Sequence, residues 1–265
     1  MTRKKIAVIT GASSGLGKEF VKLICQKKEI EEIWAIARNQ DKLNKLKSQT
    51  GRKVNPISMD LSDLSQIETL GQMLADSQVT VCYLINNAGY GKFGSYSDLS
   101  VAESVNMLNL NNNATVAVGL TCLPYMRQGS HIINIASQAA FQPLPYMNLY
   151  SASKAFVRSY TRSLHMELRD RGITATAVCP GWMKTPFYER ADIGSSHTVT
   201  RFRCMASAAK VARKALADAD HGKDHSIYGP YVNLCHIASK LLPQKFMMRF
   251  WLLQQHLDYS RPSQQ

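Results

Sequence analysis

The sequence contains no pair of cysteines at metal-binding or redox spacing and no hydrophobic run of transmembrane length. Its six cysteines are scattered and fall mostly within apolar segments, so we expect reduced thiols, no metal site and a cytoplasmic protein. The apolar run IAVIT behind the basic N-terminal residues is too short for the hydrophobic region of a signal peptide. Linkers, repeats and low-complexity tracts are also missing, which favours a single domain over residues 1–265.

Acidic residues are the scarcer charge, 19 against 32 lysines and arginines, which gives a formal net charge of +13. Such an excess attracts anionic partners: nucleic acid, a membrane surface or a phosphate-rich cofactor. The basic residues crowd the first 55 positions without a nucleic-acid motif. We therefore expect a solvated basic face and no nucleic-acid partner, because interleaved aromatic residues are missing as well.

Short apolar runs alternate along the chain with amphipathic stretches. The runs lie at 5–10, 32–37, 54–59, 81–86, 131–136 and 173–180, with a weaker one near 225–229. Helical stretches are expected at 15–28, 39–49, 62–76, 100–127 and 148–171. The alternation predicts an α/β fold, a single doubly wound Rossmann domain with a seven-stranded parallel sheet. Because the apolar runs are continuous, helices are expected on both faces of that sheet.

Two later segments lack chemistry-bearing motifs. Residues 186–205 have no clear period and follow the sixth strand, so we expect a substrate flap there. Residues 232–257 are expected to form a helical C-terminal extension. Its apolar positions at helical spacing are Phe246, Phe250, Leu253 and Leu257, widened by Met247 and Trp251. The alternatives for this extension are packing on its own domain or a second subunit, covering an apolar substrate, or lying on a membrane surface. We expect packing combined with partial lining of the pocket.

The glycine-rich stretch TGASSGLG, residues 10–17, directly follows the first strand and opens the first helix. Gly11 permits a tight turn, Gly15 lets the backbone approach a ligand, and Gly17 lets the helix pack closely on the strand. The N–H groups of the helix then face an anion. This position in the chain predicts a dinucleotide site, with the spacing TGxxxGxG instead of GxGxxG.

Arg38 follows the second strand, where NAD-binding folds offer a carboxylate to the 2'-hydroxyl of the adenosine ribose. A guanidinium pairs with a 2'-phosphate, whereas a carboxylate would repel it. The sequence therefore favours NADP(H). The alternative is a strand-end arginine in solvent, since the glycine-rich turn contains no second basic residue.

Tyr150 and Lys154 lie one helical turn apart, on the same face of a helix. A nearby cation favours the ionised phenol and lowers its pKa toward the physiological range, where it can exchange protons. For an isolated YxxxK pattern the alternative is an exposed tyrosine beside a solvated lysine.

Five ordered motifs decide between these alternatives: the glycine-rich turn, NNAG at 86–89, NIAS at 134–137, YSASK at 150–154 and PGWMKT at 180–185. With them the chain resembles the short-chain dehydrogenase/reductase family, of the classical NADP(H)-preferring type, over about residues 4–186. The resemblance implies that Tyr150 is the catalytic acid/base, that Lys154 lowers its pKa and holds the nicotinamide ribose, and that Ser137 hydrogen-bonds the substrate oxygen. Hydride transfer to a ketone builds negative charge on oxygen, so a hydroxyl donor and a proton source also fit that chemistry independently.

The resemblance further implies a catalytic asparagine that bends its helix and supports a water relaying protons to Lys154. Counting back from LPYM places it at Asn111, with Asn109, Asn112 and Asn113 as competitors, and the cluster could instead mark only a kink. For Thr185, a helix N-cap ahead of Pro186 is an additional role. The other implied cofactor contacts are Ser13, Ser14 and Leu16 at the pyrophosphate; Asp60 and Leu61 at the adenine; Asn87, Ala88 and Gly89 beside the adenosine; and Pro180, Gly181 and Thr185 at the nicotinamide.

Three function classes follow. An NADP(H)-dependent oxidoreductase is favoured because the set of Ser137, Tyr150 and Lys154 is complete; a non-catalytic NADP(H) sensor or scaffold comes second and a nucleic-acid binder last. The expected substrate is a secondary alcohol or ketone on a bulky hydrophobic skeleton, a hydroxysteroid or bile acid first and a 3-oxoacyl thioester second. We expect a homodimer or homotetramer, with peripheral membrane contact as a less favoured alternative.

Overall fold

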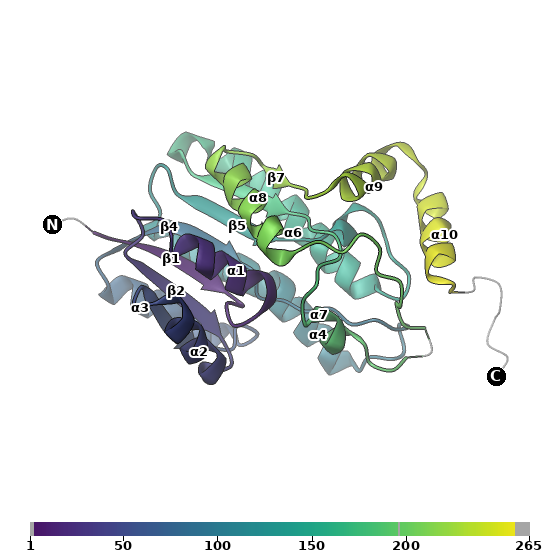
Figure 1. Ribbon diagram of the computed structural model, residues 1–265, viewed down its shortest axis with the longest axis horizontal. Helices are drawn as coiled ribbons and strands as arrows, with labels where there is room; N and C mark the ends of the chain where they lie inside the picture. Colours follow the sequence, from purple (N-terminus) through teal and green to yellow (C-terminus); the bar gives the residue numbers. More distant parts are fainter. Residues whose placement is uncertain (1–2, 196, 258–265) are drawn as a thin grey trace.

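A single parallel sheet forms the centre of the computed structural model, which describes residues 3–195 and 197–257 (Figure 1). Its seven strands follow the order β3-β2-β1-β4-β5-β6-β7. The strands are β1 (Lys4–Thr10), β2 (Glu32–Ala37), β3 (Val54–Ser58), β4 (Val79–Asn86), β5 (His131–Ile135), β6 (Thr174–Val178) and β7 (His225–Ser226). The predicted fold class and the parallel arrangement are confirmed, and the weak seventh strand is only two residues long.

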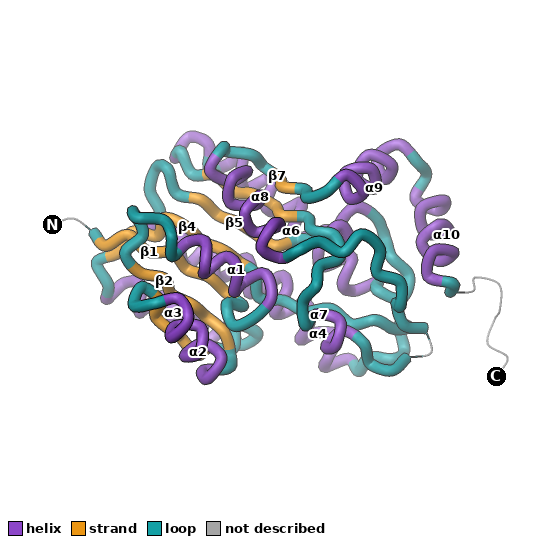
Figure 2. The backbone as a smooth tube through the Cα atoms, viewed as in Figure 1, coloured by secondary structure: helices purple, strands orange, loops and turns teal. Residues whose placement is uncertain are grey.

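Helices cover both faces of the sheet (Figure 2). They are α1 (Gly15–Ile24), α2 (Gln40–Thr50), α3 (Leu64–Asp76), α4 (Val101–Leu108), α5 (Ala114–Cys122), α6 (Asn148–Glu167), α7 (Phe187–Ala191), α8 (Ala208–Asp220), α9 (Pro230–Leu241) and α10 (Gln244–Gln255). The sequence prediction missed α8 and took residues 100–127 as one helix. A π-helical turn, Asn109–Asn113, separates α4 from α5 there, and a 3-10 turn follows α5.

Successive residues of each central strand enter different cores. In β1, Ala7 and Ile9 pack with α1 and α8, whereas Ile6 and Val8 pack with α3 and α5 on the opposite face. Both faces of the strand are therefore buried, which is why its sequence is a continuous apolar run without alternation.

The strand order reverses at β1, because the chain runs outward through β2 and β3 and then returns to β4 on the other side. At such a point the loops after the two neighbouring strands diverge and leave a crevice at their carboxyl ends. The loops are joined at their base, since the Thr10 hydroxyl accepts hydrogen bonds from the backbone N–H groups of Asn87 and Ala88, both at 3.0 Å. This fixes the two walls of the crevice relative to one another.

Helices α9 and α10 extend beyond the end of the sheet (Figure 1). The face of α10 that packs is formed by Met247, Trp251, Leu252 and Gln255, and the Trp251 indole donates a 3.1 Å hydrogen bond to the Pro145 carbonyl. The predicted stripe is therefore only partly the packing face: Met247, Trp251 and the partly buried Leu257 pack, whereas three of its other members do not. Phe246, Phe250 and Leu253 are 54%, 48% and 74% exposed. Among the described residues, no helix has the length and apolarity needed to cross a membrane.

Candidate active site

The glycine-rich turn after β1 packs against the loop after β4. The Asn87 side-chain amide donates hydrogen bonds of 3.1 Å to the carbonyls of both Thr10 and Gly11. A Cβ at Gly17 would lie 2.3 Å from the Gly11 carbonyl oxygen, and one at Gly11 would lie 2.7 Å from the Asn87 amide nitrogen. Close packing therefore requires glycine at both positions, as expected for Gly17. Gly15 has a φ of +54°, a conformation that favours glycine, at the first residue of α1.

The asparagine cluster before α5 divides into an inner and an outer pair. Asn111 is fully buried; its side-chain oxygen accepts from the Tyr90 N–H at 3.0 Å, and its amide nitrogen donates to the Tyr90 carbonyl at 2.9 Å and to the Ser153 hydroxyl at 3.0 Å. Asn112 donates to the Ser153 carbonyl. Asn109 and Asn113 bond to one another at the surface.

Asn111 thus connects the π-helical turn to the loop after β4 and to α6. It also lies beside Lys154, because a Cβ at Gly89 would be 2.8 Å from the Asn111 oxygen and 3.4 Å from the Lys154 nitrogen. The predicted irregularity of the helix is present, and the structure places Asn111 next to the lysine. The water relay remains a prediction.

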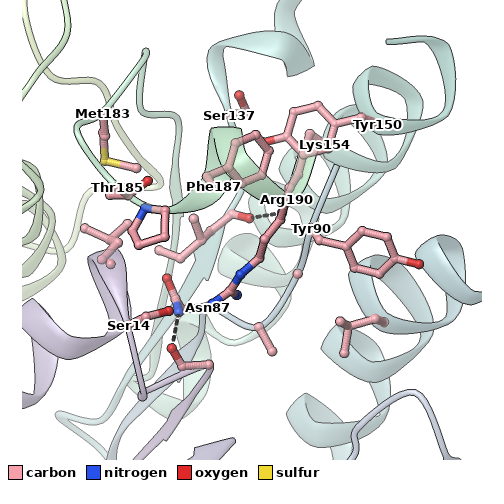
Figure 3. A pocket seen from close by; sticks show the side chains of 18 of the residues that line it. Ser14, Asn87, Tyr90, Ser137, Tyr150, Lys154, Met183, Thr185, Phe187 and Arg190 are labelled. Carbon is pink, nitrogen blue, oxygen red and sulfur yellow. Dashed lines mark hydrogen bonds between the residues drawn. The ribbon is translucent and has the colours of Figure 1, made fainter. Parts of the chain in front are cut away.

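Ser137, Tyr150 and Lys154 converge at the carboxyl end of β5 (Figure 3). Ser137 follows the strand by two residues, and its hydroxyl accepts a 3.1 Å hydrogen bond from the Ala139 N–H. Tyr150 and Lys154 come from α6, where the Lys154 ammonium donates a 2.8 Å hydrogen bond to the Ile135 carbonyl. All three side chains are buried.

Burial dominates the pKa values of this group. It raises the pKa of Tyr150 to about 12, although the neighbouring Ser137 hydroxyl acts in the opposite direction. It also lowers the pKa of Lys154 to about 8, because the interior disfavours the charged ammonium. In the protein alone burial thus sets the direction of the Tyr150 pKa shift, and the lowering of that pKa by Lys154 stays a prediction. The ammonium is bonded to a backbone carbonyl and lies 5.8 Å from the centre of the phenol ring.

These residues line one end of a cavity of about 790 Å³. Its lining includes the predicted cofactor contacts Gly11, Ser13, Ser14, Gly15, Leu16, Arg38, Asp60, Leu61, Asn87, Ala88, Gly89, Pro180, Gly181 and Thr185. Gly17 does not line the cavity, in agreement with its packing role. Asn111 does not line it either, and lies next to the lining residues Gly89 and Lys154.

Cations dominate the charge of the cavity wall. Among the described residues that line it, five are cationic and one is a carboxylate: Arg38, Lys42, Lys92, Lys154 and Arg190 against Asp60. Arg38 is largely exposed, and its nearest contact with Asp60 is 4.0 Å, so the guanidinium is not held by a tight ion pair. Lys42, one helical turn further along the chain, adds a second cation at this end of the cavity. The sequence prediction missed it.

A further cation comes from the expected flap. Arg190 extends from α7 into the cavity, toward Asn87 (Figure 3). The backbone of this helix is held in place because Phe93 N–H donates to the Ala191 carbonyl at 2.8 Å and the Lys92 ammonium donates to the Arg190 carbonyl at 2.7 Å. The sequence alone did not indicate Arg190, because its direction depends on the path of an irregular loop. Thr185 lines the cavity but does not cap α7, whose N-cap position is Pro186.

A comparison with family profiles finds that residues 5–194 match the short chain dehydrogenase profile. The chain belongs to the short-chain dehydrogenase family. An uncharacterized oxidoreductase of Staphylococcus epidermidis is 32% identical over 194 residues, which is 72% of this chain and 84% of the relative. One from Staphylococcus aureus is 32% identical over 184 residues, 68% and 79% of the two chains. The protein is thus an oxidoreductase of this family.

Solved structures of other short-chain dehydrogenases have the same fold. One from Sphingobium yanoikuyae in complex with NADPH has a TM-score of 0.73 at 22% identity and covers 98% of both chains. One from Burkholderia phymatum in complex with NAD has a TM-score of 0.77 at 21% identity and covers 99% of both. Since these two neighbours differ in cofactor, the choice for this chain depends on its own residues.

Proposed function

We propose that the protein is an NADP(H)-dependent oxidoreductase that transfers a hydride between the nicotinamide and a secondary alcohol or ketone on a bulky hydrophobic skeleton. The observation that carries the proposal is the meeting of Ser137, Tyr150 and Lys154 at one end of a cavity whose wall carries five cations and one carboxylate. Such a wall suits a ligand with several phosphates. Gly15, which lines the cavity at the start of α1 with a positive φ and no side chain, fits close approach of a pyrophosphate to the backbone.

The preference for NADP(H) is supported by Arg38 and Lys42. Both line the cavity at the end of β2, where a 2'-phosphate on the adenosine would lie. A loosely paired guanidinium can form charge-assisted hydrogen bonds with phosphate without first breaking an ion pair.

The proton chemistry belongs to Ser137 and Tyr150. In ketone reduction the nicotinamide, when bound, supplies the hydride, and the two hydroxyls donate hydrogen bonds to the carbonyl oxygen. Tyr150 then transfers its proton to the developing alkoxide. Because burial raises the pKa of Tyr150 to about 12, the phenol is protonated at neutral pH. The protein alone is therefore prepared for reduction, and alcohol oxidation needs a phenolate that becomes more abundant as the pH rises.

Lys154 has a positioning role beside the phenol. Its ammonium is anchored to the Ile135 carbonyl at the end of β5, and it lines the cavity. We infer that it donates to the ribose next to the nicotinamide, as the family resemblance implies. Asn111 holds α6 in register with the loop after β4 through Ser153 and Tyr90.

The substrate end is apolar, which supports a large hydrophobic ketone. The lining side chains there are Leu144, Met147, Trp182, Met183, Phe187 and Tyr188. A hydroxysteroid or bile acid is the first candidate, and a 3-oxoacyl thioester is the alternative.

The test is consumption of NADPH, followed by absorbance, with a neutral steroid ketone, an oxo-bile acid and a 3-oxoacyl thioester. Steady turnover of at least one of them, faster with NADPH than with NADH, is the expected result. Tight NADPH binding without turnover of any ketone would instead favour a sensor or scaffold on this fold.

A further inference from the structure

A second, smaller cavity of about 60 Å³ lies beside the substrate end of the first. The two share three lining residues, Gln138, Leu144 and Trp182, so they adjoin one another. Helix α10 covers the second cavity with Met247, Phe250, Trp251, Gln254 and Gln255. Its volume accommodates a group of a few heavy atoms and excludes a ring skeleton.

The wall of the second cavity is largely apolar and aromatic, and its only charged side chains among the described residues are two cations. Arg201 and Arg203, from the loop between α7 and α8, contribute to its wall, and no acidic residue does so among the described part of the chain. Within that part, no ion pair joins either arginine to a carboxylate. Burial raises the pKa of Tyr231, another lining residue, and the charge of Arg203 acts on it in the opposite direction as a minor contribution.

A buried glutamine of α10 holds the arginine loop in place. Gln255 is 5% exposed, its side-chain oxygen accepts from the Arg201 N–H, and its amide nitrogen donates to the Arg201 carbonyl, both at 3.1 Å. Burying a glutamine costs free energy unless its amide is hydrogen-bonded, and an apolar side chain would fill the same space without that cost. Packing alone therefore does not explain Gln255. This contact fixes the backbone of Arg201 beside the cavity, and the exposed side chain starts from that fixed point.

Gln138 supplies an available polar group at the boundary between the two cavities. Its side-chain oxygen is buried and has no hydrogen-bond partner among the described residues. A buried amide oxygen without a donor favours a ligand hydroxyl or N–H group, so it marks polar contact with the substrate at this boundary but does not itself bind the anionic oxygens.

We propose that the second cavity is a subsite for an anionic oxygen group carried by the substrate, a carboxylate on the end of the hydrophobic ketone. The inference rests on the proposed function, because it takes the adjoining cavity to hold that ketone. Guanidinium groups match the geometry of a carboxylate and pair with it through charge-assisted hydrogen bonds. The small volume accepts the anionic end alone and leaves the skeleton against the apolar wall.

An oxo-bile acid and its methyl ester form a matched pair that differs only in charge. The wild-type enzyme should show the lower KM for the acid. Arg201→Gln and Arg203→Gln should each raise the KM of the acid by about tenfold, the loss expected for one charge-assisted hydrogen bond, and leave the ester within about twofold. Lys245→Gln, at an exposed position of α10 outside the cavity wall, is the control and should change neither KM.

Gln255→Met tests the positioning role of the glutamine. It should raise the KM of the acid with little change in kcat, and leave both constants of the ester close to their wild-type values. A merely structural role would instead lower the kcat of both compounds together.

A phosphate on a thioester carrier is another source of the same anionic chemistry. A 3-oxoacyl group on coenzyme A, compared with the same acyl group on neutral N-acetylcysteamine, distinguishes this source from a carboxylate. The subsite is supported if the arginine variants no longer show a lower KM for the anionic member of a pair, in the acid and ester pair or in the two thioesters.

Calorimetric titration of the NADPH complex with a bile acid that lacks the ketone, and with its methyl ester, separates the subsite from catalysis. If no ketone is turned over but the acid binds more tightly than the ester and the arginine variants remove the difference, the proposed function fails and the subsite stands. If the variants leave acid and ester, and both thioesters, in their wild-type ratios, the proposal is overturned.

Discussion

Tyr150 supplies the proton in the proposed reaction, so a change that removes only its hydroxyl should separate catalysis from binding. Tyr150→Phe is expected to lower kcat by on the order of a thousandfold, as for loss of a general acid. The affinity for NADPH, measured by fluorescence titration, should stay within about twofold, because the ring and its contact with Phe187 remain. Retention of most of the activity would contradict the assignment.

Arg38 follows β2 and Arg190 comes from α7, and variants of these two cavity-lining residues should affect NADPH and NADH differently. Losing a charge-assisted pair costs about 2 kcal/mol, or more than tenfold in affinity. Arg38→Ala should therefore weaken NADPH by that factor and leave NADH nearly unchanged. Arg190→Gln should weaken both to the same extent, because its side chain extends toward Asn87 (Figure 3). Asn87 is hydrogen-bonded to the glycine-rich turn, where the shared pyrophosphate would lie. A wild-type enzyme that prefers NADH would contradict the role of Arg38.

Lys154 makes stability depend on pH with a defined sign. Burial lowers its pKa to about 8 in the folded protein from an ordinary value of 10.5. Between these values the unfolded chain holds a proton that the folded chain has lost, so the stability contributed by this residue increases as the pH rises. Below about pH 8 the charged lysine is buried at a cost of roughly 3 kcal/mol.

Comparison with a variant that cannot titrate isolates this effect. The free energy of unfolding of Lys154→Met, measured in urea, should exceed that of the wild type most at pH 7, and the difference should shrink toward pH 10. A constant difference across this range would show that the lysine does not titrate there.

The motifs predicted most of the site because they stand in loops that directly follow strands, and parallel strands bring those loops to one edge of the sheet. Lys42 could have been predicted in the same way, because it lies in the first turn of α2, four residues after Arg38. Arg190, Arg201 and Arg203 could not be predicted, because the sequence of residues 186–205 has no clear period from which the direction of a side chain follows. The raised pKa of Tyr150 was also unpredictable from spacing, since it depends on burial instead of on the charge one turn away.

At the scale of the element, α10 provides a matched pair of substitutions. Trp251 is 6% exposed and is hydrogen-bonded to Pro145, whereas Leu253 is 74% exposed. Trp251→Ala should lower the free energy of unfolding by about 3 kcal/mol, and Leu253→Ala by less than about 0.5 kcal/mol. Chemical denaturation of both variants checks this, and equal losses would mean that α10 packs through its other face.

The sequence predicted the strands better than the helical faces. A strand that is buried on both faces has a continuous run of apolar residues in its sequence, and this signal does not depend on which elements cover it. In α10, by contrast, both sides carry large apolar residues, and only the tertiary contacts decide that Met247 and Trp251 face inward. Helix α8 could have been predicted in the same way as the other helices, since Val211, Ala215 and Ala219 recur on one face and charged residues lie on the other.

For the whole molecule, the exposed apolar residues of α9 and α10 bear on self-association. Leu234, Ile237, Leu241 and Leu253 are each more than half exposed, and large apolar surfaces of this kind are commonly covered by a partner. We propose a homodimer or homotetramer that covers them. Sedimentation should show an oligomer, and Leu241→Glu should shift it toward the monomer. If the wild type is a monomer that binds anionic vesicles, these residues contact a membrane surface instead of a second subunit.

The contact between Gly17 and the Gly11 carbonyl also limits how the gene can change. A side chain at position 17 would collide with a main-chain oxygen, which no second mutation can remove. Gly71 in α3 is different, because an alanine there would meet only the Thr121 methyl group, at 3.3 Å, and Thr121→Ser deletes that group. A selection for function should therefore accept alanine at position 71, with or without Thr121→Ser, and recover only true revertants of alanine at position 17. Glycine at position 17 therefore cannot be replaced through a series of single tolerated substitutions.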